Sequence, residues 1–189
     1  MKINLEQIYK ELQAWREERK ITAESQKTGY LVNVMEELGE LAGALRDYEK
    51  FSKHDCPYCE IDKQIAEHGI IDALCDISVF TINAGADIPC YNKPTRLELE
   101  PCLSLDNLLK EIADHQRCFN SITLYYVLGV CASLCHQYGF NFEIAMLETI
   151  KEINSRTGAY DEKAKKWIKD TSDETRKKWY KANYDLARL

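Results

Sequence analysis

The sequence predicts an all-α protein, and three observations lead to this fold class. First, apolar residues recur at intervals of three and four along most of the chain, which is the period of one face of a helix. One such series is Leu5, Ile8, Tyr9, Leu12 and Trp15. Second, the alternation of apolar and polar residues that marks a half-buried strand is nearly absent. Third, only four prolines and eight glycines interrupt 189 residues, of which 45% are hydrophobic. We therefore expect a helical bundle with a sizeable core.

Six helices are expected in chain order. The first follows Asn4, which with Gln7 three residues later matches a capping box. The others are predicted over residues 29–51, 61–87, from 104 onward, 120–138 and 141–155. The third ends before Pro89, because proline cannot continue a helix. Residues 90–102 are predicted to form an irregular connector. The tail from residue 161 is predicted to form short helices and an ordered end.

The length of the chain suits one domain. We expect residues 1–155 to form the helical domain and residues 156–189 to form a basic extension that packs on it. The extension carries ten Lys and Arg against six Asp and Glu, a net charge of +4, whereas the fifteen basic and twenty-five acidic residues before it give −10. This asymmetry suits a site in which carboxylates hold a cation and lysines meet an anionic ligand. A solvated helical tail would have the same composition.

The bulk sequence also argues against some partners. No run of about 18 apolar residues is present, which is what a membrane-spanning helix needs. The first four residues are polar enough that no signal-peptide core begins there. We therefore expect a cytoplasmic protein with no membrane partner. Its net charge of −6 predicts no binding to nucleic acid.

The eight cysteines do not predict a disulfide framework, because such frameworks belong to secreted chains. Reduced thiols are expected instead. Cys56 and Cys59 form one CxxC, which is half of a zinc site, and no second CxxC completes it nearby. Cys131, Cys135 and His136 could complete it only through a tertiary contact. Structural Zn²⁺ at Cys56 and Cys59 is therefore the disfavoured alternative.

A group of acidic residues lies in the middle of the second predicted helix, in the run Glu36-Glu37-Leu38-Gly39-Glu40. Glu37 and Glu40 lie about 60° apart around the helix axis and so share a face. No Lys or Arg follows four residues after either of them, so their repulsion is not relieved within the helix. A bound cation would resolve this conflict. An ordinary solvated helix edge is the alternative.

A second acidic pair, Asp72 and Asp76, lies in the third predicted helix, about 40° apart around its axis. Its neighbours are apolar, where an unpaired carboxylate is costly. If the two helices pack antiparallel, Glu37, Glu40, Asp72 and Asp76 can face one cavity. Hard oxygen ligands of this kind suit Mg²⁺ or Mn²⁺, which then bridges substrate phosphates. We therefore predict that these four residues bind metal.

The run Glu36-Glu37-x-x-Glu40, followed by an acidic pair on the next helix, resembles the MazG-like all-α nucleoside triphosphate pyrophosphohydrolases. This superfamily includes the dimeric dUTPases and the phosphoribosyl-ATP pyrophosphohydrolases. Its signature is EExxE, a spacer and then ExxD, and Asp76 matches the final Asp. Ala73 stands where the signature has Glu, and Asp72 is the proposed substitute.

A looser resemblance lies near the end of the chain. The run Glu152-Ile153-Asn154-Ser155 is similar to the Glu-Val-Asn-x-Ser segment of phage and bacterial MazG-like proteins. A lysine-bearing stretch at 163–166 and the pair Asn183-Tyr184 follow, as they do in those relatives. The resemblance therefore covers residues 30–90 well and 145–185 loosely. Residues 91–140 match no segment of the family.

The resemblance implies a homodimer that cleaves the α–β phosphoanhydride of a nucleoside triphosphate, with a deoxynucleotide expected. Bound Mg²⁺ would orient the attacking water, and Glu36 or Asp72 would accept its proton. Trp15 or Trp179 would stack on the base, Asn83 would reach the base or sugar, and lysines would hold the pyrophosphate. The residues expected to bind substrate are Trp15, Asn83, Glu152, Asn154, Lys163, Lys166, Lys181, Asn183 and Tyr184. Ala73 keeps open one alternative, a non-catalytic helical protein that binds nucleotides or another partner.

Overall fold

The computed structural model describes residues 2–53, 57–101, 103–163 and 166–189, with only the backbone of Pro57 and Lys166. This part of the chain is mostly helical, which confirms the predicted all-α class. Its α-helices are α1 (Glu6–Glu18), α2 (Ala23–Phe51), α3 (Pro57–Ala84), α4 (Leu105–Arg117), α5 (Ser121–Gln137), α6 (Phe142–Ser155) and α7 (Asp173–Arg176). Two short 3₁₀ helices, η1 (Cys90–Asn92) and η2 (Tyr184–Ala187), lie between and after them. No helix in the described ranges is both long and apolar enough to cross a bilayer.

All six predicted helices form, and their ends differ from the prediction by a few residues. The largest difference is at α2, which begins at Ala23 because Thr22 caps it. The Thr22 side chain accepts a hydrogen bond from the backbone N–H of Ser25 at 3.2 Å, which satisfies one of the free donors of the first turn. Ser104 and Asn107 form a capping box that starts α4 where the sequence placed it.

The capping box predicted for the first helix is wrong. Asn4 belongs to a strand, β1 (Lys2–Asn4), and Leu5 is the cap residue of α1 without a side-chain cap. β1 pairs antiparallel with β2 (Arg96–Glu98), where Ile3 lies opposite Leu97. Both of these apolar side chains are buried. Strand pairing with the connector, rather than a helix cap, therefore fixes the start of the chain.

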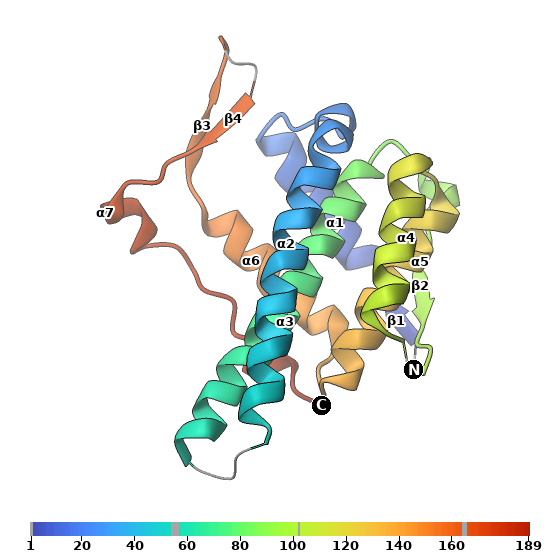
Figure 1. The fold of residues 1–189 in the computed structure, drawn as a ribbon. Helices are drawn as coiled ribbons and strands as arrows, with labels where there is room; N and C mark the ends of the chain where they lie inside the picture. Colours follow the sequence, from blue (N-terminus) through green and yellow to red (C-terminus); the bar gives the residue numbers. More distant parts are fainter. Residues whose placement is uncertain (1, 54–56, 102, 164–165) are drawn as a thin grey trace.

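The tail contains a β-hairpin that the sequence analysis missed. β3 (Gly158–Asp161) pairs antiparallel with β4 (Lys166–Lys169), and the hairpin projects from the helical body (Figure 1). The short helices α7 and η2 follow it, as expected for this segment. A side chain at Gly158 would lie 2.5 Å from the Trp167 ring and 2.2 Å from the carbonyl oxygen of Ile168. Gly158 therefore allows β4 to approach closely.

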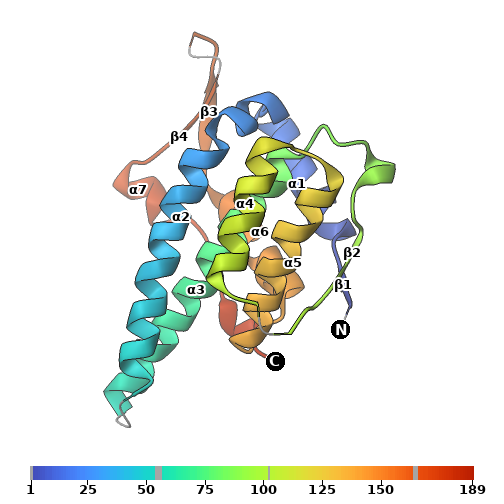
Figure 2. The same ribbon diagram turned by 45° about the vertical axis from the view of Figure 1, so that its right-hand side comes forward.

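Helix α3 is the centre of the bundle. It runs antiparallel to α2, and the two helices lie side by side in both views (Figures 1 and 2). It also packs against α1, α5 and α6. Its buried apolar residues are Ala66, Ile70, Ile71, Ala73, Leu74, Cys75, Ile77, Val79, Ile82 and Ala84. Carboxylates in the middle of α3 are therefore held among apolar side chains.

The end of the chain docks on the same bundle. The backbone N–H of Leu189 donates to the carbonyl of Gly139 at 2.8 Å. The Arg188 guanidinium donates to the Glu67 carboxylate of α3 at 2.9 Å. These contacts place the end of the predicted extension against α3 and the segment before α6. The division of the chain at residue 155 stays a prediction.

A buried histidine on α4 makes the stability of this fold depend on pH. His115 has no exposed surface, its Nδ1 lies 2.8 Å from the Thr123 hydroxyl, and its ring packs edge-on against Tyr30 and Phe119. Burial lowers the pKa of His115 to about 4, because the imidazolium would lose its hydration there. The unfolded chain therefore takes up a proton, below about pH 6.5, that the folded chain does not bind.

We predict that acid destabilises the fold through this residue. Between pH 7.5 and 5.0, the free energy of unfolding of the wild type should fall by about 2 kcal/mol more than that of His115→Gln, which cannot titrate. Urea titrations at the two pH values measure the difference. His136→Gln, at an exposed position, is the matched control and should behave as the wild type. The same pH dependence in wild type and His115→Gln would contradict the prediction.

Candidate functional site

Two carboxylates from neighbouring helices line one cavity. Glu37 comes from the middle of α2 and Asp76 from the middle of α3. Burial, together with the charges of Asp76 and Glu40, raises the pKa of Glu37 to about 8. Burial and the charge of Asp72 raise the pKa of Asp76 to about 7. The protein thus holds two acidic groups where each resists ionisation unless a positive charge comes close.

The other two predicted metal ligands lie beside this pair. Asp72 is half-buried, and its Oδ1 accepts a hydrogen bond from the Tyr184 hydroxyl. Burial raises the pKa of Asp72, and the hydrogen bond from Tyr184 lowers it. Glu40 is exposed on α2, and its charge acts on both Glu37 and Asp76. The sequence predicted that all four carboxylates face one cavity, but only Glu37 and Asp76 line it. Glu40 and Asp72 lie close enough for their charges to act on this pair.

Glu36 is exposed and does not line the cavity, so its predicted part in catalysis has no support from its position. Within the described ranges, no three His, Cys, Asp or Glu side chains form a group already arranged to hold a metal ion. Glu37, Glu40, Asp72 and Asp76 act on one another through their charges.

The cavity has a volume of about 570 Å³, which is within the usual range for small-molecule sites. It lies between the helical body and the β3–β4 hairpin. Its lining residues are Trp15, Ile21, Asn33, Glu37, Asp76, Val79, Phe80, Asn83, Ile153, Arg156, Trp167 and Lys169. Trp15, Asn83, Glu37 and Asp76 were predicted as site residues, so the structure brings together predicted residues from three helices.

Two basic residues that were not predicted, Arg156 and Lys169, line the same cavity as the carboxylates. Arg156 follows α6, and Lys169 ends β4. Burial and the nearby charge of Arg156 lower the pKa of Lys169, while Asp76 raises it. Arg156 also donates to the Glu152 carboxylate at 3.0 Å. One cavity therefore combines two carboxylates with two cations.

Two tryptophans and an arginine join the hairpin to α1. The Arg19 guanidinium lies 5.4 Å from the centre of the Trp15 ring and 5.0 Å from that of Trp167, within cation–π range of both. The same side chain donates to the carbonyls of Asn154 and Arg156, each at 3.3 Å. Trp167 was not predicted. Trp167 and Lys169 lie two positions apart on the four-residue strand β4, which is too short for its alternation to be recognised in the sequence.

Three residues that line this cavity each carry a buried donor that has no partner among the described residues. The donors are Nε1 of Trp15, Nδ2 of Asn83 and Nε of Arg156. A buried N–H without an acceptor is costly, and such groups are few in native proteins. The cavity therefore favours a ligand rich in hydrogen-bond acceptors.

Several predicted substrate-binding residues have structural contacts instead. The Glu152 carboxylate accepts hydrogen bonds from Arg156, from Lys181 and from the backbone N–H of Ala182. Lys181 is otherwise exposed. Tyr184 is buried, and its hydroxyl donates to Asp72 rather than lining the cavity. These residues hold the tail against α6 and α3, and a direct contact with substrate does not follow from their positions.

The remaining predictions in this segment lie off the cavity or outside the described atoms. Asn154 and Asn183 are exposed and take part through their backbones, in hydrogen bonds with Arg19 and Glu148. Lys163 is exposed in the turn between β3 and β4. The side chain of Lys166 lies outside the described residues. The basic contribution to the cavity comes from Arg156 and Lys169 instead.

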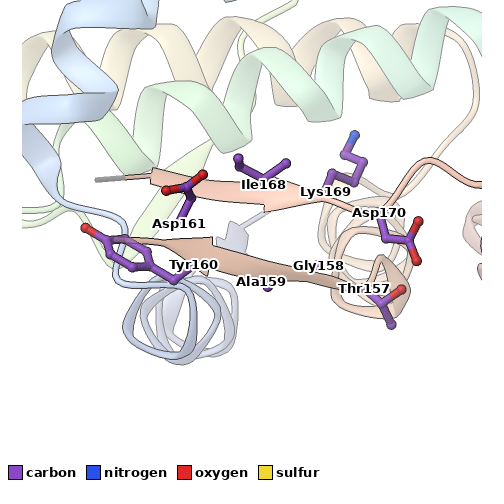
Figure 3. A pocket seen from close by; sticks show the side chains of 8 residues that line it. All are labelled: Thr157, Gly158, Ala159, Tyr160, Asp161, Ile168, Lys169 and Asp170. Atoms are coloured by element: carbon purple, nitrogen blue, oxygen red, sulfur yellow. The ribbon is translucent and has the colours of Figure 1, made fainter. Parts of the chain in front are cut away.

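A second cavity, of about 590 Å³, lies on the hairpin itself. Figure 3 shows that its side chains all come from β3, β4 and the residues beside them, and that Lys169 extends from β4 on the side away from β3. No helix contributes to this cavity, and it contains neither Glu37 nor Asp76. The cavity at α2 and α3 is therefore the better candidate for chemistry.

The cysteines bear on the disfavoured zinc alternative. Cys56 lies outside the described residues, and Cys59 is disulfide-bonded, so a thiolate of Cys59 is not available to zinc. The expectation of reduced thiols holds for Cys75, Cys90, Cys118, Cys131 and Cys135. It is wrong for Cys59.

Comparisons with protein-family models, curated proteins and solved structures find no match for this chain. The MazG-like resemblance therefore stays a prediction from a short motif. The function is inferred from the residues that line the α2–α3 cavity.

We predict that Glu37 destabilises the metal-free protein at alkaline pH. Because its pKa is raised in the folded state, the stability it contributes is present at low pH and is lost as pH rises through about 8. In the absence of divalent cations, Glu37→Gln should therefore melt at a higher temperature than the wild type at pH 9. The two proteins should differ much less at pH 5.

Differential scanning calorimetry at the two pH values measures this effect. Glu36→Gln removes the neighbouring, exposed charge and is the matched control, for which we expect a small change. A melting temperature for Glu37→Gln at pH 9 that equals or falls below the wild-type value would contradict the prediction. It would show that burial and the charge of Asp76 do not oppose the ionisation of Glu37.

Proposed function

We propose that this protein hydrolyses a nucleoside triphosphate, with a deoxynucleotide expected, to the monophosphate and pyrophosphate in a Mg²⁺-dependent reaction. The observation that carries the proposal is the composition of one cavity. Carboxylates of Glu37 and Asp76, cations of Arg156 and Lys169, and aromatic rings line the same space. A nucleotide with bound Mg²⁺ presents the three complementary features: a divalent cation, an anionic polyphosphate and a flat base.

The residues present fit a divalent cation. Burial and mutual repulsion raise the pKa values of Glu37 and Asp76, and a cation would favour their ionised forms. Glu37 and Asp76 would hold Mg²⁺ or Mn²⁺ from the cavity wall, with Glu40 and Asp72 beside them. When bound, the metal would supply charge neutralisation at the phosphate oxygens and a more acidic water.

The protein side chains have separate parts in the proposed reaction. Arg156 and Lys169 would bind the phosphates and stabilise the charge that develops on the departing pyrophosphate. Asp72 is the better placed of the two predicted bases, because it lies one turn from Asp76 and is oriented by the Tyr184 hydroxyl. Trp15 and Trp167 would stack on the base and exclude water from it.

The alternative function is binding of a nucleotide without hydrolysis. Ala73 at the position of the family's Glu favours it, since one carboxylate of the signature is missing. The two functions share the cavity and differ in turnover. A binding protein would retain nucleotide with Mg²⁺ and release no pyrophosphate.

Pyrophosphate release from a panel of ribo- and deoxynucleoside triphosphates tests the proposal. We expect Mg²⁺-dependent turnover that falls at least about 100-fold in kcat for Asp76→Asn, because the metal then loses a charged ligand. Lys169→Met should raise KM more than it lowers kcat. Lys163→Met, exposed in the hairpin turn and not lining the cavity, is the matched control for loss of one positive charge.

Two results would overturn this proposal. One is nucleotide binding with no pyrophosphate released from any substrate, which would favour the non-catalytic alternative. The other is full activity in Asp76→Asn, which would remove the assigned metal site.

The homodimer also remains a proposal, supported by exposed apolar side chains on α2 and α3. Val32 and Met35 on α2 are 64% and 58% exposed, and Ile61 and Ile65 on α3 are 58% and 64% exposed. Exposed apolar pairs on two long helices would be covered by an interface that runs along both helices. A second copy of this chain is the occupant that the family resemblance implies.

We predict that the protein is a dimer in solution and that Met35→Lys together with Ile65→Lys makes it a monomer. The two lysines would place unpaired charges in a desolvated interface. Light scattering after gel filtration measures the mass. Ile122→Lys changes a residue on α5 that is 65% exposed, and this control should leave the mass unchanged. A monomeric wild-type protein at micromolar concentration would refute the dimer.

A further inference from the structure

We propose that the Asn83 side chain makes this cavity selective for keto bases over amino bases, through a fixed hydrogen-bond donor at its inner wall. The inference rests on the proposed function and adds to it the class of base that the site accepts. Uracil, thymine, guanine and hypoxanthine carry a carbonyl where cytosine and adenine carry an amino group.

The orientation of the Asn83 amide is fixed by Arg16. The Arg16 guanidinium donates to Oδ1 of Asn83 at 2.6 Å, and both side chains are buried. A guanidinium can only donate, so the amide must present its oxygen to Arg16. Its NH₂ group is then left on the other side. Arg16 is therefore a positioning residue that prevents the amide from flipping and offering an acceptor.

The NH₂ group of Asn83 has no partner among the described residues, although the residue is only 1% exposed. Trp15, the residue before Arg16, lines the same cavity and leaves its Nε1 donor unpaired as well. In the described part of the chain, no buried unpaired acceptor lines this cavity. The wall that Trp15 and Asn83 share is therefore complementary to acceptors such as a carbonyl oxygen.

The position of Asn83 along α3 assigns this wall to the base rather than to the phosphates. Asn83 follows Asp76 by seven residues, which is two helical turns and about 10 Å along the axis. That separation leaves room for a sugar between a phosphate bound near Asp76 and a base that reaches Asn83. Phe80 and Val79 line the cavity in the intervening turn, where an apolar surface suits a sugar and the face of a base.

A keto group and an amino group differ sharply at such a donor. The carbonyl oxygen accepts the free N–H of Asn83, whereas an amino group faces it with a second donor and leaves both unpaired. One buried hydrogen bond gained or lost corresponds to about 10- to 100-fold in specificity. We expect a preference of this size.

Two matched substrate pairs test the proposal, because their bases differ in keto against amino character and little else in shape. The pairs are dUTP with dCTP, and dITP with dATP. We expect kcat/KM of the wild type to be about 10- to 100-fold higher for the keto member of each pair. Asn83→Asp replaces the NH₂ donor with an acceptor of the same shape, and Arg16 keeps its partner. The preference should disappear or reverse in that variant.

Asn33→Asp is the matched control, because it adds the same charge to the same cavity at a residue with no contact to Arg16. Its charge should weaken all four nucleotides alike and leave the two ratios unchanged. Equal kcat/KM values within each wild-type pair, or ratios that survive in Asn83→Asp, would overturn the selectivity and leave the hydrolysis standing. Equal values would also result if a phosphate oxygen were the partner of Asn83.

A failure of the proposed hydrolysis can be distinguished from a failure of the base selectivity. If no nucleotide releases pyrophosphate, calorimetric titration of the same four nucleotides with Mg²⁺ gives the ratios as dissociation constants. Tighter binding of dUTP and dITP, lost in Asn83→Asp, would then support the selectivity in a binding protein. Equal or reversed affinities, or no binding of any of the four, would overturn it.

Discussion

The antiparallel packing of α2 against α3 is the constraint on which the rest of the site depends. It holds Glu37 and Asp76 on one cavity although burial and mutual repulsion oppose their ionisation. The surrounding apolar residues of α3 pack on several helices at once, so the carboxylates cannot separate without disrupting the core. Side chains kept in an unfavourable arrangement by a well-packed scaffold are typical of functional sites rather than of structural ones.

The tail supplies the opposite charge, and buried acids of α6 determine where it lies. The Glu148 and Glu152 carboxylates accept backbone hydrogen bonds from Asn183 and Ala182. They thereby fix the segment that brings Tyr184 to Asp72. Beyond Glu152, at the C-terminal end of the same helix, Arg19 donates to the carbonyls of Asn154 and Arg156 and lies within cation–π range of Trp15 and Trp167. None of these contacts uses the charge of Lys169, which lines the cavity.

Much of the helical fold could be predicted from the sequence, because each helix buries a continuous apolar face with the period of 3.6 residues. The acidic residues Glu37 and Asp76 could be predicted for the same reason, as charged exceptions on such faces. The β3–β4 hairpin could not, since four-residue strands are too short to establish an alternation. Arg156, Trp167 and Lys169 were therefore missed, and lysines of the tail were assigned to substrate from composition and resemblance alone.

The charge asymmetry of the chain now has two separate causes in the structure. Part of the positive charge after residue 155 is structural, since Lys181 and Arg156 pair with Glu152 and Arg188 pairs with Glu67. Another part lines the cavity through Arg156 and Lys169. Arg156 belongs to both groups, because it pairs with Glu152 and also lines the cavity. The Glu152 carboxylate thus binds both Arg156, which lines the cavity, and the backbone of Ala182 in the tail, so one buried acid connects the position of the tail with the cationic part of the cavity.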